Sequence, residues 1–252
     1  MGGALPTSTT TMTLMVVIPT YNERENIAVL VDEVLVLGDA VRVLIVDDAS
    51  PDGTGEIADD LARQHPGRVD VLHRAGKEGL GRAYVAGFQH ALGFGTTHIA
   101  QMDADHSHRP EDLRAMMQVA VQSGVDLVLG SRYIEGGETI GWPWHRRLIS
   151  RIGGGYAGLI LGVPIRDLTG GFKLWKSDTL RDIDLPTIHA DGYGFQIETT
   201  YRALRRQHSV AQVPIVFHDR VAGASKLSRR VVVEAAMMVW PLRLRQLFGR
   251  PW

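Results

Sequence analysis

The stretch Thr97-His98-Ile99-Ala100-Gln101-Met102-Asp103-Ala104-Asp105 decides the fold class and marks one candidate site. An apolar segment leads directly into two carboxylates that are separated by a single residue. In open α/β folds, ligands bind beyond the carboxyl ends of the parallel strands. With Ser107 close behind, the two carboxylates offer the hard oxygen ligands that Mg²⁺ and Mn²⁺ prefer. An isolated Asp-x-Asp is also common at solvated strand ends, so the neighbouring segments have to decide between the two interpretations.

Strand and helix patterns alternate through the first half of the chain, which predicts a mostly parallel central sheet flanked by helices. Short apolar strands are expected at residues 14–18, 41–46, 69–72 and 125–129, together with one that ends at Asp103. Helices are expected between them, at residues 23–37, 51–64, 80–92 and 111–122, where apolar residues recur at helical spacing. The glycine fingerprint of dinucleotide-binding folds and the phosphate loop of nucleotide triphosphatases are both absent.

The second half is less regular. A helix near 195–206 and a strand near 210–217 are expected to extend the sheet and shape an acceptor site. No Pro/Ser/Gly-rich linker separates the halves, so we predict a single domain over residues 14–227. Residues 1–13 read as a disordered leader without the layout of a signal peptide. Residues 228–252 read as a basic amphipathic C-terminal helix.

The composition of the chain limits which kinds of ligand, metal site and membrane attachment are expected. The formal net charge of the 252 residues is −1, which gives no field that favours nucleic acid. Cysteine is absent, so disulfides and thiolate-bound metals are excluded. No stretch reaches the ~20 apolar residues of a membrane span. The apolar segments 148–165 and 231–240 have basic residues within or beside them. Each suits a helix on an anionic membrane face or a core helix with a basic end, and both alternatives stay open.

The ends of the first two strands carry further polar residues. Tyr21 could stack on a base and Glu23 could hold a ribose or a base edge, whereas the alternative is an ordinary helix start. Asp47 and Asp48 are adjacent acids at the end of a buried strand, which is costly unless they are paired or face a ligand. They could bind a base or a ribose hydroxyl, or they could form a capping network for the next helix.

Basic residues in later loops could contact phosphate. Arg132 follows the fifth strand and could brace a diphosphate with its planar fork. Arg220 and Lys226 lie on a glycine-containing loop that could close over phosphates. Asp167 in a polar turn could orient a sugar hydroxyl. The glycine-rich segment 76–82 before a helix could bring backbone N–H groups to an anion, although a plain loop is as good an explanation.

Taken together, these segments resemble the polyprenol-phosphate mannose synthases, which are inverting glycosyltransferases of the GT-A fold, an α/β fold with a mostly parallel central sheet. The similarity runs from Val16 to about Leu227. It rests on segments 17–23 (Val-Ile-Pro-Thr-Tyr-Asn-Glu), 46–54, 102–105, 130–133, 167–172 (Asp-Leu-Thr-Gly-Gly-Phe) and 219–226. The last two narrow the resemblance from glycosyltransferases in general to those that use a polyprenol phosphate.

The resemblance implies a role for each matching position. GDP-mannose would be held by Pro19, Tyr21, Glu23, Val46, Asp47, Asp48, Asp103, Ala104, Asp105, Ser107, Arg132, Arg220 and Lys226. The metal, Mg²⁺ or Mn²⁺, would be bound by Asp103, Asp105 and Ser107. The polyprenyl phosphate acceptor would contact Arg132, Arg147, Asp167 and Lys226. The catalytic set would be Asp103, Asp105, Arg132, Arg220 and Lys226. Some relatives have Gln at the position of Ser107, so water would complete the shorter ligand's coordination here.

The function implied by the resemblance is transfer of mannose from GDP-mannose to a polyprenyl monophosphate with inversion. Many relatives add C-terminal transmembrane helices that this sequence does not show, so we expect a peripheral protein on the cytoplasmic face of the membrane, or one that relies on an integral-membrane partner protein. A polyprenyl-phosphate glucosyl- or aminosugar transferase with a UDP donor is the alternative enzyme. A nucleotide-sugar-binding regulatory subunit is the non-enzymatic alternative, and the joint retention of the acidic and basic site residues speaks against it.

Overall fold

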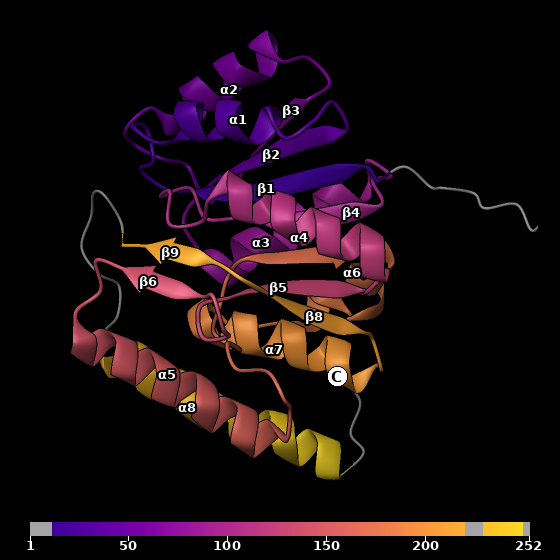
Figure 1. Ribbon diagram of the computed structural model, residues 1–252. Coiled ribbons are helices and arrows are strands. Elements are labelled where there is room, and N and C mark those ends of the chain that lie inside the picture. Colours follow the sequence, from indigo (N-terminus) through magenta and orange to yellow (C-terminus); the bar gives the residue numbers. More distant parts are fainter. Residues whose placement is uncertain (1–11, 220–228, 249–252) are drawn as a thin grey trace, which may run out of the picture.

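A seven-stranded sheet forms the centre of the molecule in the computed structural model, which describes residues 12–219 and 229–248 (Figure 1). The strand order is β3-β2-β1-β4-β7-β5-β8. The strands are β1 (Leu14–Thr20), β2 (Val41–Asp47), β3 (Val69–His73), β4 (His98–Gln101), β5 (Leu127–Ser131), β7 (Lys173–Lys176) and β8 (Val210–Pro214). All neighbouring strands are parallel except β7, which is antiparallel to β4 and β5. The predicted mostly parallel sheet is therefore confirmed.

Helices cover both faces of this sheet. They are α1 (Ile27–Leu35), α2 (Thr54–Gln64), α3 (Leu80–Leu92), α4 (Pro110–Ser123), α5 (Trp144–Leu161), α6 (Ser177–Asp182), α7 (Gly192–Arg205) and α8 (Arg229–Leu247), with a 3₁₀ turn η1 (Leu185–Thr187). Alternate residues of β1 enter two cores. Val16 packs in the cluster that includes α1 and α4, and Val17 packs in the cluster that includes α3 and α7. Strands buried on both faces read as unbroken apolar runs, which is why the sequence located them.

The antiparallel strand β7 was not predicted. Its sequence, Lys-Leu-Trp-Lys, is short and begins and ends with a cation. Nevertheless Lys173, Leu174 and Trp175 are all buried between β4 and β5. Because β7 runs in the opposite direction, its amino end lies at the same edge of the sheet as the carboxyl ends of β4 and β5. The turn before β7, which contains Gly171, therefore reaches the edge that carries Asp103.

The expected strand 210–217 is divided in two. β8 ends at Pro214, and β9 (Val216–His218) leaves the central sheet to pair in parallel with β6 (Glu138–Ile140). Proline has no N–H to donate, so a strand commonly ends there. The small β6–β9 sheet thereby carries Phe217 and Asp219 towards the end of β5.

Helices α5 and α8 lie side by side on the side of the molecule away from α1 and α2 (Figure 1). The indole N–H of Trp240 on α8 donates to the hydroxyl of Tyr156 on α5 at 2.9 Å. α8 occupies most of the predicted 228–252 helix, whose residues 228 and 249–252 fall outside the described part. Residues 1–11 of the predicted leader, 1–13, likewise lie outside the described part. The last leader residue, Thr13, is described and its backbone N–H donates to the Thr97 hydroxyl at 3.0 Å. Among the described helices, none has the length and apolar character needed to cross a bilayer.

Candidate active site

Asp103 and Asp105 lie just beyond the carboxyl end of β4, in the turn that leads to α4. Asp103 is half-buried and Asp105 is buried. One carboxylate oxygen of Asp105 accepts hydrogen bonds from the backbone N–H of Ser107, at 3.2 Å, and from the Ser107 hydroxyl. The turn thus holds two carboxylates and one hydroxyl at the edge of the sheet where the sequence motif predicts them.

Asp103 is fixed by two residues that sequence analysis did not assign to the site. The Tyr84 hydroxyl on α3 donates to Asp103 Oδ1 at 3.0 Å, and the Asp103 backbone N–H donates to His108 Nδ1 at 3.1 Å. Burial raises the pKa of Tyr84 well above its ordinary value, and the nearby Asp103 raises it further, so the phenol stays a donor. Burial also lowers the pKa of His108, which matches a neutral ring that accepts at Nδ1.

The donor atoms of this turn fit a hard divalent cation. Carboxylate and hydroxyl oxygens are the ligands of Mg²⁺ and Mn²⁺, and Mg²⁺ is often bound by only one or two carboxylates together with substrate phosphates and water. The described residues contain no cluster of three or more His, Asp or Glu side chains arranged for a metal. Gly171 lies beside Asp103, since a Cβ there would stand 3.9 Å from Asp103 Oδ2 and 3.4 Å from Gln196 Nε2, at ordinary contact distances. The residues present suit a cation that shares its coordination with a phosphorylated ligand.

The acids at the end of β2 have protein partners. Asp47 accepts hydrogen bonds from the Thr20 hydroxyl at 3.1 Å and from the Ser50 backbone N–H at 3.1 Å, so it connects the end of β1 to the loop after β2. Asp48 forms an ion pair with Arg74. Burial raises the pKa of Asp48, and Arg74 opposes that rise. The partners of Asp47 are Thr20 and Ser50, and the N-cap residue of α2, Gly53, has no side-chain cap hydrogen bond. The capping and the ligand-binding interpretations of these acids both stay predictions.

The end of β1 places Tyr21 and Glu23 next to these acids. The Lys77 ammonium lies over the Tyr21 ring, 3.8 Å from its centroid. Glu23 accepts a hydrogen bond from the Asn26 side chain at 2.8 Å, and its backbone N–H donates to the Thr54 hydroxyl at 3.0 Å. The nearby positions Pro19 and Val46 belong to β1 and β2, where Val46 has a fully buried side chain. The donor-binding roles of all four residues stay predictions.

The glycine-rich segment 76–82 does bring a backbone N–H, that of Gly81, to an anion at the start of α3. That anion is the carboxylate of Asp191, which precedes α7 and accepts a hydrogen bond from the Gly81 N–H at 2.5 Å. A Cβ at Gly79 would overlap the Asp191 carboxylate, and one at Gly81 would stand 2.5 Å from the Ala190 carbonyl oxygen. The glycines here allow close packing of α3 against the start of α7.

Arg132 and Asp167 form a buried bidentate ion pair. Arg132 Nε donates to Asp167 Oδ2 at 2.7 Å, and a terminal guanidinium nitrogen donates to Oδ1 at 2.6 Å. The Arg132 backbone N–H also donates to Asp167 at 3.0 Å. Burial works against the charge, but Asp167 raises the pKa of Arg132 above its ordinary value. Asp167 therefore orients a guanidinium directly, and its expected contact with the acceptor sugar or phosphate stays a prediction.

A second guanidinium, from Arg146 on α5, lies beside this pair. It stacks on the Trp142 ring at 4.1 Å, and Arg132 lies 5.4 Å from the same ring. A terminal nitrogen of Arg146 donates to Asp219 at 2.8 Å. Arg146 Nε and Trp142 Nε1 are buried donors that have no hydrogen-bond acceptor among the described residues. Buried donors of this kind usually have a partner, which makes this corner a candidate anion site.

Arg147, the α5 residue expected to contact the acceptor, is exposed. Helical spacing would not have selected Arg146, because Arg147 lies seven residues before the buried Gly154, which is close to two full turns, and is therefore nearer to the buried side of α5 by periodicity. An acceptor role for Arg147 stays a prediction. Arg220 and Lys226, which the resemblance also assigns, lie outside the described residues.

The acidic turn and the guanidinium pair face a common side chain. The Phe217 ring on β9 lies 5.5 Å from the His108 ring, and the Arg132 guanidinium lies 5.4 Å from Phe217. His108 also stacks on Phe172, at 4.5 Å. The carboxylates of the acidic turn and the guanidinium of Arg132 are thus brought to neighbouring positions at one edge of the sheet. Arg146, which completes the guanidinium pair, was not among the predicted residues.

Solved structures share this fold. Glucosyl-3-phosphoglycerate synthase from Mycobacterium tuberculosis, in complex with Mn²⁺, UDP and glucosyl-3-phosphoglycerate, superimposes with a TM-score of 0.66 over 96% of this chain and 82% of that chain, at 20% identity. The same enzyme with Mg²⁺ and UDP gives a TM-score of 0.66, again at 20% identity, over 96% of this chain and 81% of that chain. These neighbours hold Mn²⁺ or Mg²⁺ with UDP.

Closer relatives are found by sequence. The model of Glycosyl transferase family 2 matches residues 15–184. Polyprenol monophosphomannose synthase of Mycolicibacterium smegmatis is 45% identical over 237 residues, which cover 93% of this chain and 89% of the relative. Undecaprenyl-phosphate mannosyltransferase of Micrococcus luteus is 45% identical over 239 residues, which cover 93% and 96%. The chain therefore belongs to glycosyl transferase family 2 and, within it, to the polyprenol-phosphate mannosyltransferases.

Proposed function

We propose that this protein transfers mannose from GDP-mannose to a polyprenyl monophosphate, with inversion at the anomeric carbon, to give polyprenyl-phosphate β-mannose. The observation that carries the proposal is the meeting of an oxygen-donor turn, Asp103 to Ser107, with the guanidinium groups of Arg132 and Arg146 at one edge of the sheet. Two relatives at 45% identity over most of the chain, both named as mannosyl-transferring enzymes with polyprenyl-type acceptors, support the choice of sugar and acceptor.

The acidic turn would serve the donor. Asp103 and Asp105, with Ser107, would hold Mg²⁺ or Mn²⁺, and a bound cation supplies positive charge against the diphosphate of the leaving group. Asp105 is fixed by Ser107, and Asp103 is fixed by Tyr84 and His108. Preorganised ligands of this kind stabilise the departing charge without rearranging during the reaction. Tyr21, Glu23 and the Asp47–Asp48 pair at the ends of β1 and β2 would hold the guanosine.

The guanidinium corner would serve the acceptor. A phosphate monoester is largely ionised near pH 7, so its oxygen needs positioning more than deprotonation. Arg132 and Arg146, each oriented by an aspartate, would bind this phosphate opposite the donor diphosphate. One acceptor oxygen then forms a bond to the anomeric carbon while the bond from that carbon to the diphosphate breaks. GDP leaves with the bonding electron pair, and the configuration inverts.

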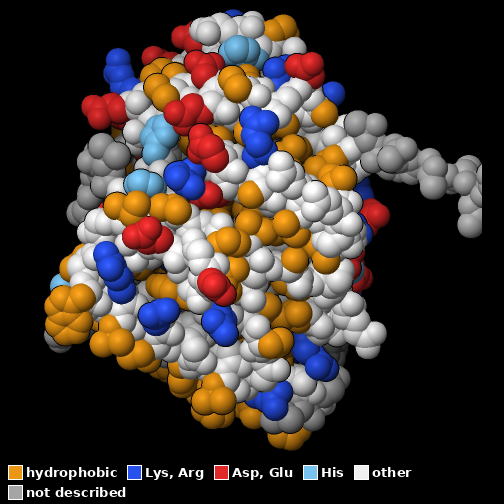
Figure 2. Space-filling model, in the orientation of Figure 1, with side chains coloured by type: hydrophobic (Ala, Val, Ile, Leu, Met, Phe, Trp, Pro, Cys, Tyr) orange, Lys and Arg blue, Asp and Glu red, His pale blue; other side chains and the backbone are white. Residues whose placement is uncertain are grey.

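The acceptor's lipid chain requires access to a membrane, and the α5–α8 face suits that task. Nine of the fourteen large apolar side chains that are exposed in the described residues lie on these helices or directly after them, namely Trp144, Leu148, Ile149, Ile152, Leu159, Met237, Trp240, Leu244 and Phe248. Figure 2 shows hydrophobic side chains gathered along the margin that α5 forms.

Charge complements this apolar face. α5 contains three arginines and no acid, and α8 contains four arginines and one glutamate, whereas the whole chain has a net charge of −1. Apolar residues interleaved with arginine are typical of helices that lie in the interface of an anionic membrane. We therefore place the enzyme peripherally on the cytoplasmic face, where an integral-membrane protein is a further candidate partner.

Radiolabelled sugar transfer to a short polyprenyl phosphate tests the proposed reaction. We expect product from GDP-mannose with Mn²⁺, none after chelation, and little from UDP-glucose. Asp105→Ala is the matched inactive variant, and Asp39→Ala, at an exposed loop acid, is the control that retains activity. Transfer from UDP-glucose in preference to GDP-mannose would identify the alternative donor. Donor binding without transfer from either sugar would favour the binding-only alternative.

A further inference from the structure

Tyr84 connects the hydrophobic core to the acidic turn. Its side chain is fully buried on α3, yet its hydroxyl donates to Asp103 Oδ1 at 3.0 Å. We propose that Tyr84 is a positioning residue for the divalent cation, because it fixes the rotation of the Asp103 carboxylate and directs Oδ2 towards the ligand. The proposal rests on the metal site of the proposed function. It assigns a functional role to a residue that would otherwise be described only as part of the hydrophobic core.

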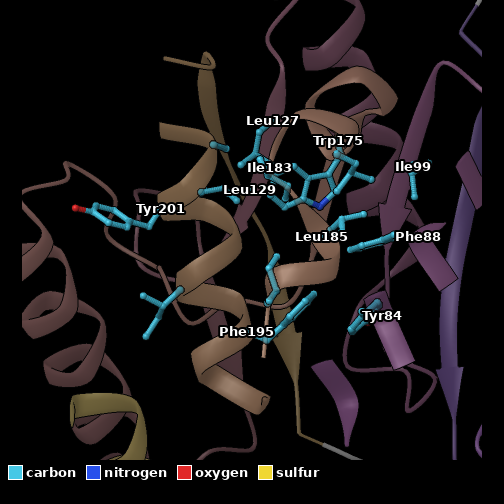
Figure 3. Packing of buried hydrophobic residues seen from close by; sticks show 14 of the residues in the cluster. Tyr84, Phe88, Ile99, Leu127, Leu129, Trp175, Ile183, Leu185, Phe195 and Tyr201 are labelled. Carbon is cyan, nitrogen blue, oxygen red and sulfur yellow. The ribbon is translucent and has the colours of Figure 1, made fainter. Parts of the chain in front are cut away.

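The Tyr84 ring has little freedom to move. It stacks on Phe195 of α7 with centroids 5.8 Å apart and an interplanar angle of 4°, and on Phe88 with centroids 5.6 Å apart (Figure 3). Stacked aromatic pairs in a close-packed core keep a defined geometry. The position and direction of the phenol oxygen are therefore fixed by the packing of α3 against α7.

Gly87 sets the distance of α3 from the sheet. A Cβ at this position would stand 2.6 Å from Val17 Cγ1 and 2.9 Å from Val46 Cγ2, so only glycine allows α3 to lie this close to β1 and β2. Tyr84 is three residues earlier and lies on the same side of the helix. This close approach brings the phenol oxygen within hydrogen-bond distance of Asp103, in the turn after β4.

Asp103 is then held at two separate atoms. Tyr84 binds Oδ1, and His108 accepts from the backbone N–H. The other carboxylate oxygen, Oδ2, lies on the side of Gly171, 3.9 Å from where a Cβ on that residue would be. Groups that bind a metal ligand from behind orient it, and their loss typically weakens metal affinity by roughly 10–100-fold. A phenol that merely filled the core would have no such effect.

Tyr84→Phe tests the inference, since it removes the hydroxyl and keeps the ring. The matched control is Tyr201→Phe, at another fully buried tyrosine, whose hydroxyl contacts Gln246 on α8. Mn²⁺ binding to each full-length protein is measured by electron paramagnetic resonance with saturating GDP. We expect Tyr84→Phe to weaken Mn²⁺ affinity by roughly 10-fold, and Tyr201→Phe to leave it unchanged. In transfer assays, Tyr84→Phe should raise the half-saturating Mn²⁺ concentration by the same factor and keep kcat close to wild type at saturating Mn²⁺.

The possible results distinguish a failure of the positioning role of Tyr84 from a failure of the proposed metal site. Equal Mn²⁺ affinity in wild type and Tyr84→Phe, or equal weakening in Tyr201→Phe, would overturn the positioning role. No Mn²⁺ binding by folded wild type would instead overturn the metal site of the proposed function. If Tyr84→Phe does not fold, Phe195→Leu takes its place, because it keeps the hydroxyl and loosens the stack. That variant should also weaken Mn²⁺ binding, and unchanged affinity would count against the role of Tyr84.

Discussion

Asp167 and Arg132 pair through two parallel hydrogen bonds, with the carboxylate side chain fully buried and the guanidinium 5% exposed. Bidentate pairing fixes the plane of the guanidinium as well as its position. Arg132 also has three aromatic rings 5.2–5.4 Å away, from Tyr133, Trp142 and Phe217. The charge is thus held in one orientation at the end of β5, beside Arg146, with which Arg132 is proposed to bind phosphate.

Removal of the carboxylate should destabilise the fold. Asp167→Ala leaves the Arg132 charge buried and unpaired, so we expect the free energy of unfolding to fall by about 3–5 kcal/mol. Asp60→Ala is the control, because its partner Arg63 is mostly exposed and such pairs contribute about 1 kcal/mol or less. Urea denaturation followed by circular dichroism measures both values. If the free energy of unfolding fell by a similar small amount in both variants, the buried pair would contribute no more to stability than the exposed one.

The same pair predicts a dependence of stability on pH. Burial alone would raise the pKa of Asp167, but Arg132 and the surrounding hydrogen bonds lower it below its ordinary value. A carboxyl whose pKa is lowered by folding contributes stability that is complete above its unfolded pKa and is lost as pH falls through its folded pKa. Wild type should therefore lose stability below about pH 4, and Asp167→Asn should lose less over that range. Parallel stability–pH curves for the two proteins would contradict this assignment.

Adjacent arginines on α5 give a matched pair for the acceptor site. Arg146 stacks on Trp142 and pairs with Asp219, whereas Arg147 is exposed. Arg146→Ala should raise the KM for a detergent-dispersed polyprenyl phosphate by about 10-fold or more, since a charge-assisted contact contributes roughly 1.5–3 kcal/mol. Arg147→Ala should change it little in the same assay. A larger effect at Arg147 would restore the assignment made from sequence.

Membrane binding can be tested with two exposed apolar residues of similar accessibility. Ile152 on α5 is 60% exposed and Val121 on α4 is 65% exposed. Ile152→Asp should reduce co-sedimentation with vesicles that contain phosphatidylglycerol, because it places a negative charge in the proposed interface. Val121→Asp should leave co-sedimentation unchanged. Equal partition of both variants with wild type would mean that the α5–α8 face does not dock on lipid.

The candidate site could be placed at one edge of the sheet from the sequence, because its motifs follow strands that are buried on both faces. Asp103, Asp105 and Arg132 each come just after an apolar run, and parallel strands bring such ends to one edge. The elements that were missed depend on distant contacts. β7 forms only because β4 and β5 pair with it, and nothing in Lys-Leu-Trp-Lys predicts its direction.

The roles of individual side chains could not be predicted from the sequence, because they too depend on contacts between distant parts of the chain. Tyr84 and Phe88 have the spacing of an ordinary apolar helix face, so the sequence cannot show that one of them carries a hydroxyl to Asp103. His108 and Arg146 became visible only when the partners of Asp103 and Trp142 were known. Local periodicity identifies which face of a helix is buried, and tertiary packing decides which polar atom on that face meets the site.

The most direct test of the central claim is the position of the cation when GDP is bound. Crystals grown with GDP and Mn²⁺ should give an anomalous Mn²⁺ peak in contact with Asp105 and Asp103 and with the GDP diphosphate, with the guanosine near Tyr21 and Asp48. A Mn²⁺ peak remote from both carboxylates, with the nucleotide bound elsewhere, would contradict the account.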